Sequence, residues 1–118
     1  MNRLTYVLIV CLASACYYDN EASLYGEAIC SDEEPTYAAT VVPILNRNCM
    51  SCHSQAVAEG GVVLETYSGV NQQAENGKLL GAITHASGFS PMPKNAPQLR
   101  ECDINAIRAW IDSGAINN

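Results

Sequence analysis

One pentapeptide constrains this chain more than any other feature: Cys49-Met50-Ser51-Cys52-His53. The two thiols of a C-x-x-C-H sequence can add to the two vinyl groups of a haem, and the histidine then lies under the iron as its proximal ligand. All three groups must reach one edge and the centre of the same macrocycle, so the cofactor dictates the spacing. The motif therefore predicts one covalent haem c held by Cys49 and Cys52, with His53 as a ligand of the metal.

The N-terminal segment has the pattern of an export signal. Arg3 provides a positive start, residues 4–12 form an apolar run too short for a permanent membrane helix, and residues 13–15 are small. Cleavage of residues 1–15 leaves Cys16 first, which resembles a bacterial lipoprotein signal and predicts lipidation of Cys16. The resemblance has one departure, because the leucine lies four residues before the cysteine, and ordinary secretion through the same cleavage site is the alternative.

The remaining cysteines are compatible with an exported protein. Cys30 and Cys102 are left over once the signal, lipid and haem cysteines are assigned, and two such thiols most often pair as a disulfide. In the chain-entropy model, closing a loop of this length stabilises the fold by about 4 kcal/mol. Two alternatives remain: a four-cysteine zinc site that includes Cys49 and Cys52, although zinc ribbons usually bring two C-x-x-C pairs, and a thioredoxin-like dithiol, although no βαβ pattern is present.

Length and charge limit the organisation and the partners. A chain of 118 residues has room for one domain, and we expect a single folded domain at 30–118 preceded by an acidic tether at 16–29. The tether reaches at most about 45–50 Å, which keeps a lipid-anchored domain close to its membrane. The net charge of −6 disfavours nucleic acid and anionic membrane surfaces as partners and is compatible with docking onto a basic patch.

Helical periodicity covers most of the expected domain. Thr36 is a candidate N-cap for a helix over 37–48, which Pro43 kinks or shortens to a start at Val42. A second helical region runs over 68–85 with a break near Asn76-Gly77. The other expected segments are a short extended stretch at 62–64, an irregular segment at 86–97 with three prolines, and a last helix that begins near Cys102-Asp103, buries Ile104, Ile107, Trp110 and Ile111, and stops at Gly114.

Two residues are candidates for the second axial position. Met92 lies between Pro91 and Pro93, which fix the backbone and can hold the thioether at a set distance from the iron, so Met92 is the predicted distal metal ligand. His85 is the alternative and would give bis-histidine ligation, although it can also bond the backbone or a haem propionate. A vacant distal position is the third possibility.

At these residues the chain resembles a small single-haem cytochrome c of the all-helical class I type, and in particular exported bacterial lipoprotein cytochromes. The resemblance rests on the haem motif, the Pro-Met-Pro segment, the sequence from Gly60 to Tyr67, and the C-terminal helix with Trp110. It implies an all-α fold of about three to four helices around one haem, with the N- and C-terminal helices packed together and Trp110 near the haem.

The function implied by the resemblance is electron transfer rather than catalysis. We expect a monomeric carrier with His/Met ligation that passes one electron between exported or membrane-bound redox proteins on the periplasmic side of a Gram-negative envelope. The residue after Cys16 is Tyr17 rather than the aspartate that retains some lipoproteins at the inner membrane, which favours the outer membrane. The alternatives are a haem sensor or peroxidase-like enzyme with an open distal position, and a subunit whose haem is structural.

Overall fold

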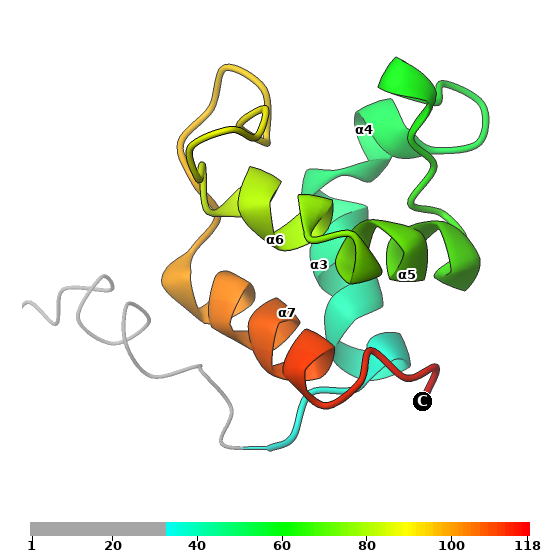
Figure 1. Cartoon of the computed structure of the whole chain (residues 1–118). Helices are drawn as coiled ribbons and strands as arrows, with labels where there is room; N and C mark the ends of the chain where they lie inside the picture. The colour runs from blue at the N-terminus through cyan, green and yellow to red at the C-terminus, as the bar shows by residue number, and fades with distance from the viewer. Residues whose placement is uncertain (1–32) are drawn as a thin grey trace, which may run out of the picture.

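Helices make up the regular structure of residues 33–118, the part of the chain that the computed structural model describes, and no strand is present in that range (Figure 1). The predicted signal peptide, the tether and the residues Cys16 and Cys30 lie outside the described residues. The elements in chain order are η1 (Tyr37–Val41), α3 (Val42–Asn48), α4 (Met50–His53), η2 (Glu59–Gly61), α5 (Tyr67–Glu75), α6 (Lys78–Ile83) and α7 (Glu101–Asp112). The expectation of an all-α fold is confirmed, although several helices are only one or two turns long.

The first helix starts where the sequence predicts. The Thr36 side chain accepts a hydrogen bond from the backbone N–H of Ala39, which makes it the N-cap. The first turn, η1, is wide, with i to i+5 bonds such as Val42 N–H to the Tyr37 carbonyl. Pro43 follows in the first turn of α3. A wide turn there suits a proline, whose ring would clash with the carbonyl four residues earlier in a regular α-helix.

The second helical region is divided as expected. α5 begins at Tyr67, one residue before the predicted start, and Thr66 caps it by accepting from the Gly69 N–H. Gly77 has a φ of +73°, which separates α5 from α6. α6 ends at Ile83, two residues earlier than predicted, and the irregular segment that follows is confirmed.

Gly69 marks a close contact between segments. A Cβ at this position would clash with the carbonyl oxygen of Val63, so only glycine allows α5 to begin directly beneath the chain that approaches it. That approaching chain is the predicted extended stretch. Val62 has extended backbone angles, and the Leu64 N–H donates to the His53 carbonyl at 2.8 Å. The stretch is therefore extended but makes no sheet in the described residues.

The N-terminal and C-terminal helices pack together, as the resemblance implies (Figure 1). Tyr37 of η1 lies against Trp110 of α7 with ring centroids 5.6 Å apart, and it meets Tyr67 edge to face at 5.1 Å. The first two backbone N–H groups of η1 also bond Asn118: Tyr37 N–H donates to its side-chain oxygen at 2.8 Å and Ala38 N–H to its carbonyl at 2.9 Å. These bonds satisfy donors that a helix start leaves free.

The expected burial of α7 needs one correction. Ile104, Ile107 and Trp110 are buried as predicted, but Ile111 is only partly buried, because it follows Trp110 by about 100° around the helix. Trp110 is fully buried in the core, where its Nε1–H donates to the Ile116 carbonyl at 2.9 Å. It lines neither cavity of the candidate site described below, so the implied position near the haem stays a prediction.

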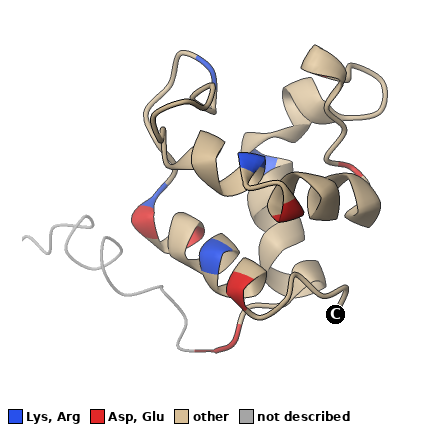
Figure 2. Cartoon of the chain, viewed as in Figure 1, with Lys and Arg blue, Asp and Glu red and all other residues tan. Residues whose placement is uncertain are grey.

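An ion pair joins α7 to α3, and Figure 2 marks the positions of the charged residues along the chain. Asp103, in the first turn of α7, is buried and accepts two hydrogen bonds from Arg100, at 3.0 and 3.1 Å. Arg47 in the last turn of α3 lies 3.5 Å from the same carboxylate. The predicted last helix begins at Glu101, one residue earlier than expected, with both acidic residues of its first turn favourably placed at the positive end of the helix dipole. Within residues 33–118, no helix has the length and apolar character needed to cross a membrane.

Candidate haem site

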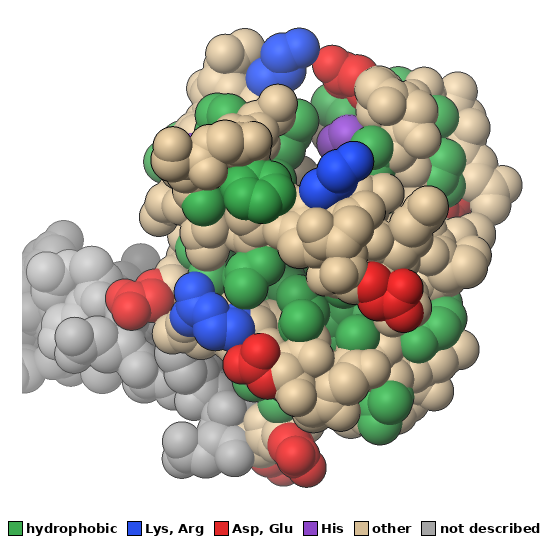
Figure 3. Space-filling view, viewed as in Figure 1, with side chains coloured by type: hydrophobic (Ala, Val, Ile, Leu, Met, Phe, Trp, Pro, Cys, Tyr) green, Lys and Arg blue, Asp and Glu red, His purple; other side chains and the backbone are tan. Residues whose placement is uncertain are grey.

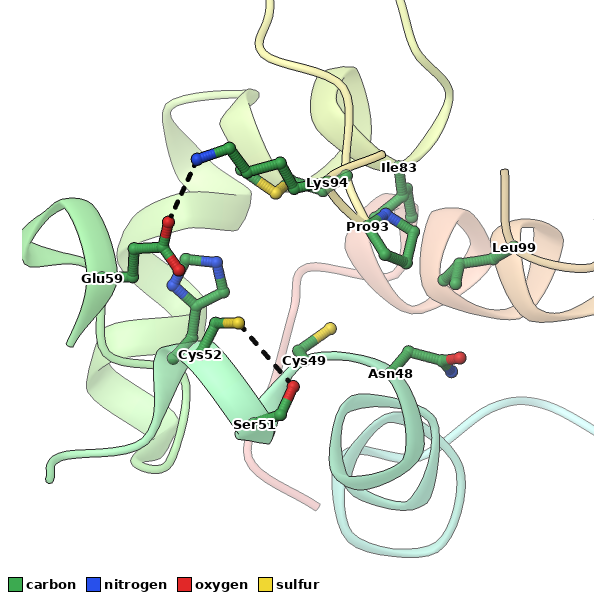
Figure 4. Close-up of a pocket in the computed structure, with 11 residues that line it drawn as sticks. Asn48, Cys49, Ser51, Cys52, Glu59, Ile83, Pro93, Lys94 and Leu99 are labelled. Carbon is green, nitrogen blue, oxygen red and sulfur yellow. Dashed lines mark hydrogen bonds and ion pairs between the residues drawn. The ribbon is translucent and has the colours of Figure 1, made fainter. Parts of the chain in front are cut away.

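The pentapeptide folds as a turn of helix attached to the end of α3. Cys49 lies between α3 and α4, and its N–H donates to the Leu45 carbonyl at 2.8 Å. His53 N–H in turn donates to the Cys49 carbonyl at 2.9 Å, which closes the single turn of α4. Because helix positions three and four apart share a face, this turn presents the three predicted haem-binding side chains on one side. Figure 4 shows Cys49 and Cys52 pointing into the space between α4 and the segment that carries Pro93 and Lys94.

All four predicted haem-binding residues line the same cavity. Cys49, Cys52, His53 and Met92 border a cavity of about 180 Å³. An adjoining cavity of about 790 Å³ shares Cys49, His53 and Met92. Figure 3 shows hydrophobic side chains on both sides of a hollow in which a histidine is visible. The structure thus brings together residues that lie up to 43 positions apart in the chain.

The lining of the larger cavity fits an iron porphyrin. Its apolar residues come from the extended stretch, from α6 and from the segment before Met92: Val62, Leu64, Leu79, Ala82, Ile83, Phe89 and Pro91. Its volume lies within the range of about 300–1,000 Å³ typical of small-molecule and cofactor sites. A c-type haem is attached through thiol groups, and its iron is ligated by imidazole and thioether groups. The residues present therefore fit this cofactor.

The orientation of His53 is set by a backbone contact. Its Nδ1 lies 3.2 Å from the Val62 carbonyl, and since a carbonyl only accepts, Nδ1 carries the proton. The neutral ring then has its free lone pair on Nε2, the atom available to a metal. A hydrogen bond of this kind is what orients a histidine ligand and fixes its tautomer.

The two candidates for the second axial position have different surroundings. Met92 lines both cavities, whereas His85 lines neither. The His85 Nε2 instead lies 3.1 Å from the Met92 carbonyl, so it donates to the backbone. This placement favours Met92 over His85 as the group that can reach a haem in the cavity.

The mouth of the cavity carries an ion pair that the sequence analysis did not single out. Lys94 Nζ lies 3.3 Å from Glu59 Oε1, joining the segment after Met92 to η2 (Figure 4). Hydrogen bonds from Lys94 and Cys52, together with the Lys94 charge, hold the pKa of Glu59 below its ordinary value. The two residues are 35 positions apart, and no local pattern links them. Both side chains are exposed, so the pair adds little to stability.

The two thiols differ in exposure. Cys49 is half-buried and Cys52 is exposed, and they are the free cysteines of residues 33–118. Burial, and then the nearby Cys52 thiol, raise the pKa of Cys49 to about 11. Ser51 donates to the Cys52 sulfur at 3.7 Å. The Cys49 thiol therefore faces apolar surroundings, and the Cys52 thiol faces solvent.

The central part of the chain is similar to a known protein family. Residues 49–95 match the family described as planctomycete cytochrome C. The matched range begins at the first cysteine of the C-x-x-C-H motif and ends three residues after Met92, so it includes almost all of the lining of the two cavities. Similarity to this c-type cytochrome family implies haem-based electron transfer, and c-type cytochromes are extracytoplasmic proteins that typically carry electrons. The expected resemblance to a cytochrome c is thus supported over this range.

Other comparisons add no further relative. No curated protein and no solved structure matches the chain. The cytochrome C match does not bear on lipidation of Cys16, which stays a prediction. The Cys30–Cys102 bridge also stays a prediction, since Cys30 lies outside the described residues. Cys102 lines a separate cavity beside Thr40 rather than the one lined by the cysteine pair, so the described structure does not assemble the alternative zinc site.

Proposed function

We propose that this chain is an exported electron carrier with one haem c, attached through Cys49 and Cys52 and ligated by His53 and Met92. The observation that carries the proposal is that these four side chains line one cavity, with the His53 Nε2 left free by the bond of Nδ1 to Val62. The similarity of residues 49–95 to a cytochrome C family supports the cofactor independently.

The residues of the chain have separate tasks in this function. When bound, the haem supplies an iron that alternates between the ferrous and ferric states. His53 would hold the iron through Nε2, with its ring oriented by the bond of Nδ1 to Val62, and a Met92 thioether would favour the reduced metal, which raises the potential relative to bis-histidine ligation. The apolar side chains of α6 exclude water and act in the same direction, because a low dielectric disfavours the extra charge of the oxidised iron.

The attachment of haem has a direct test. Protein made in a host that matures c-type cytochromes should gain the mass of one haem and give the pyridine haemochrome spectrum of two thioether links. The variant with both Cys49→Ser and Cys52→Ser should lose the covalent mass. A colourless wild-type product of unmodified mass would contradict the proposal.

The distal ligand is tested by a substitution at Met92. Met92→Ala should convert the visible spectrum of the haem-loaded protein from low-spin to high-spin and lower the potential, because alanine offers no ligand atom in place of the thioether. Leu99→Ala is a suitable control, because Leu99 lines the smaller cavity but offers no ligand atom. If the ferrous wild-type protein binds carbon monoxide rapidly and stoichiometrically, the distal position is open and the sensor or peroxidase-like alternative is correct.

We propose further that the carrier is a monomeric lipoprotein which exchanges electrons with redox proteins of the cell envelope. The support is the signal-like N-terminus ending before Cys16 and the acidic tether, both read from the sequence. Wild-type protein should partition into detergent and carry acyl mass, whereas Cys16→Ser should be released in soluble form. Soluble, unacylated wild-type protein would leave ordinary secretion as the correct alternative.

A further inference from the structure

The backbone of Met92 is held at both of its polar groups by the end of α6. Its N–H donates to the Ala82 carbonyl at 3.0 Å, and its own carbonyl accepts from His85 Nε2 at 3.1 Å. Ala82 lines the same cavity as Met92. The two bonds therefore fix the peptide of Met92 against one wall of the candidate haem site.

His85 occupies a position where a glycine is usually found. The His85 N–H bonds the Ala82 carbonyl at 3.2 Å, and the Ala86 N–H bonds the Gly81 carbonyl at 2.9 Å, which is the Schellman pattern that ends a helix. The residue at this place has a positive φ, here +51°, which is unfavourable for a residue with a side chain and free of strain for glycine. The ring is half-buried rather than part of the core, so its hydrogen bond to Met92 is the contact that sets it apart from a glycine.

The same carbonyl joins the helix end to the Met92 segment. Ala82 accepts both from the His85 N–H and from the Met92 N–H, so the helix cap and the segment share one acceptor. The segment also meets α6 away from Met92, where the Phe89 ring covers Gly81 closely enough that a Cβ there would lie 2.6 Å from it. Further along, Gln98 Nε2 donates to the Thr84 carbonyl at 2.6 Å. Only the His85 bond acts on the carbonyl of Met92 itself.

We propose that His85 is a positioning residue for Met92, whose carbonyl it holds so that the thioether stays within reach of the iron. The inference rests on the proposed function, because it takes Met92 as the distal ligand. A donor on Nε2 is present in both the neutral tautomer assigned here and the imidazolium. Restraint of the Met92 backbone means that the thioether has little freedom to lose when it binds the metal, which makes its displacement by an external ligand harder.

The experiment compares three variants of the haem-loaded protein. His85→Gly removes the donor but keeps the residue best suited to a positive φ, so the fold should be retained. His85→Gln keeps an N–H donor at a similar reach. Gln98→Ala removes a neighbouring bond between the segment and α6 without touching Met92.

Cyanide binding to the ferric protein is the main measurement. We expect His85→Gly to bind cyanide about tenfold more tightly than wild type, as loss of one hydrogen bond of about 1.4 kcal/mol predicts, with His85→Gln and Gln98→Ala within about threefold of wild type. Hydrogen exchange of the ferrous protein should be faster at the Met92 amide in His85→Gly alone. Wild-type cyanide affinity in His85→Gly, or an equal effect in Gln98→Ala, would overturn the positioning role.

The spectrum of Met92→Ala separates failure of this inference from failure of the proposed function. If Met92→Ala leaves the low-spin spectrum unchanged, Met92 is not the ligand, and both the ligation and the role of His85 are rejected. If Met92→Ala becomes high-spin while His85→Gly binds cyanide like wild type, the ligation stands and only the role of His85 is rejected.

Discussion

Cys49 and Cys52 have different surroundings although only two residues separate them. Cys49 is half-buried at the junction of α3 and α4, and burial raises its pKa to about 11, whereas Cys52 is exposed beside Ser51. The thiolate is the reactive form of a cysteine, so protonation and burial both slow reactions at Cys49. Before haem is attached, the two sulfur atoms are therefore not equivalent.

This difference predicts the order of alkylation in protein made without haem. At pH 8, iodoacetamide should modify Cys52 first and Cys49 at least tenfold more slowly, and the Cys49 rate should rise as the pH approaches 11. Peptide mass spectrometry with time gives both rates. Equal rates in the folded protein, with the urea-unfolded protein as the reference, would contradict the assigned environments.

The same pKa shift has a consequence for stability. Between pH 9 and about 11 the unfolded chain loses the Cys49 proton while the folded chain keeps it, so the folded state binds more protons and stability falls as pH rises. Urea unfolding of haem-free protein should show this decrease. Cys49→Ser should reduce it, and an identical decrease in that variant would assign the effect to other groups.

At the scale of elements, the start of α7 is joined to α3 through one carboxylate. Asp103 is buried and meets Arg100 through two hydrogen bonds and Arg47 across the helix interface. Glu101 lies in the same first turn but is exposed. The two acidic residues thus share the favourable helix end and differ in their partners, which makes them a matched pair.

Substitution of this pair should separate the two effects. Asp103→Ala should lower the free energy of unfolding by about 2 kcal/mol, because charge-assisted hydrogen bonds are lost. Glu101→Ala should change it by about 0.5 kcal/mol or less, since only the interaction with the helix end is removed. Urea titrations followed by circular dichroism measure both. A loss in Glu101→Ala as large as that in Asp103→Ala would show that the arginine contacts contribute nothing.

The elements that could be predicted from the sequence are those with local signals. Thr36, the break at Gly77 and the irregular segment with three prolines all act through their own backbone, so the residue types suffice. The wide turn η1 could not be predicted from the sequence, because Pro43 alone is compatible with either a kinked helix or a helix that starts later. The Glu59–Lys94 pair and the contact of His85 with Met92 join separate segments, and only the folded chain places them together.

For the site, the motif alone predicts the attachment residues, since the cofactor itself would set their spacing. Met92 lines the same cavity as the motif, whereas Trp110 lies in the core away from the lining. A buried tryptophan can serve any part of a small core, and here the Tyr37 ring supplies its aromatic neighbour. The composition of the sequence does not distinguish a tryptophan beside the haem site from one elsewhere in the core.

At the scale of the whole molecule, the cavities and the packed helices η1, α3 and α7, here called the frame, come mostly from different parts of the chain. Every residue that lines the two site cavities lies within 48–99. The largest fully buried side chains lie mostly outside that range, in η1, α3 and α7, and include Trp110, Leu45 and Ile107. The two ends of this frame meet where Asn118 bonds the first turn of η1.

The contact at Asn118 should contribute to global stability without affecting the haem. Asn118→Ala removes the acceptor of the Tyr37 N–H and should cost about 1 kcal/mol, whereas Asn117→Ala, at the exposed neighbouring position, should be near neutral. Thermal unfolding and the midpoint potential are measured on the same samples. A change of potential in Asn118→Ala comparable to that in Met92→Ala would show that frame and site are coupled.

The location of the cavity lining within 48–99 has a consequence for how such a protein can change. The helices η1 and α7 carry much of the buried core and contribute no residue to the cavity lining, which comes from a single uninterrupted stretch of chain. Residues 48–99 can therefore be grafted between other pairs of packed terminal helices, and we expect the visible spectrum and the midpoint potential of the haem-loaded protein to be retained.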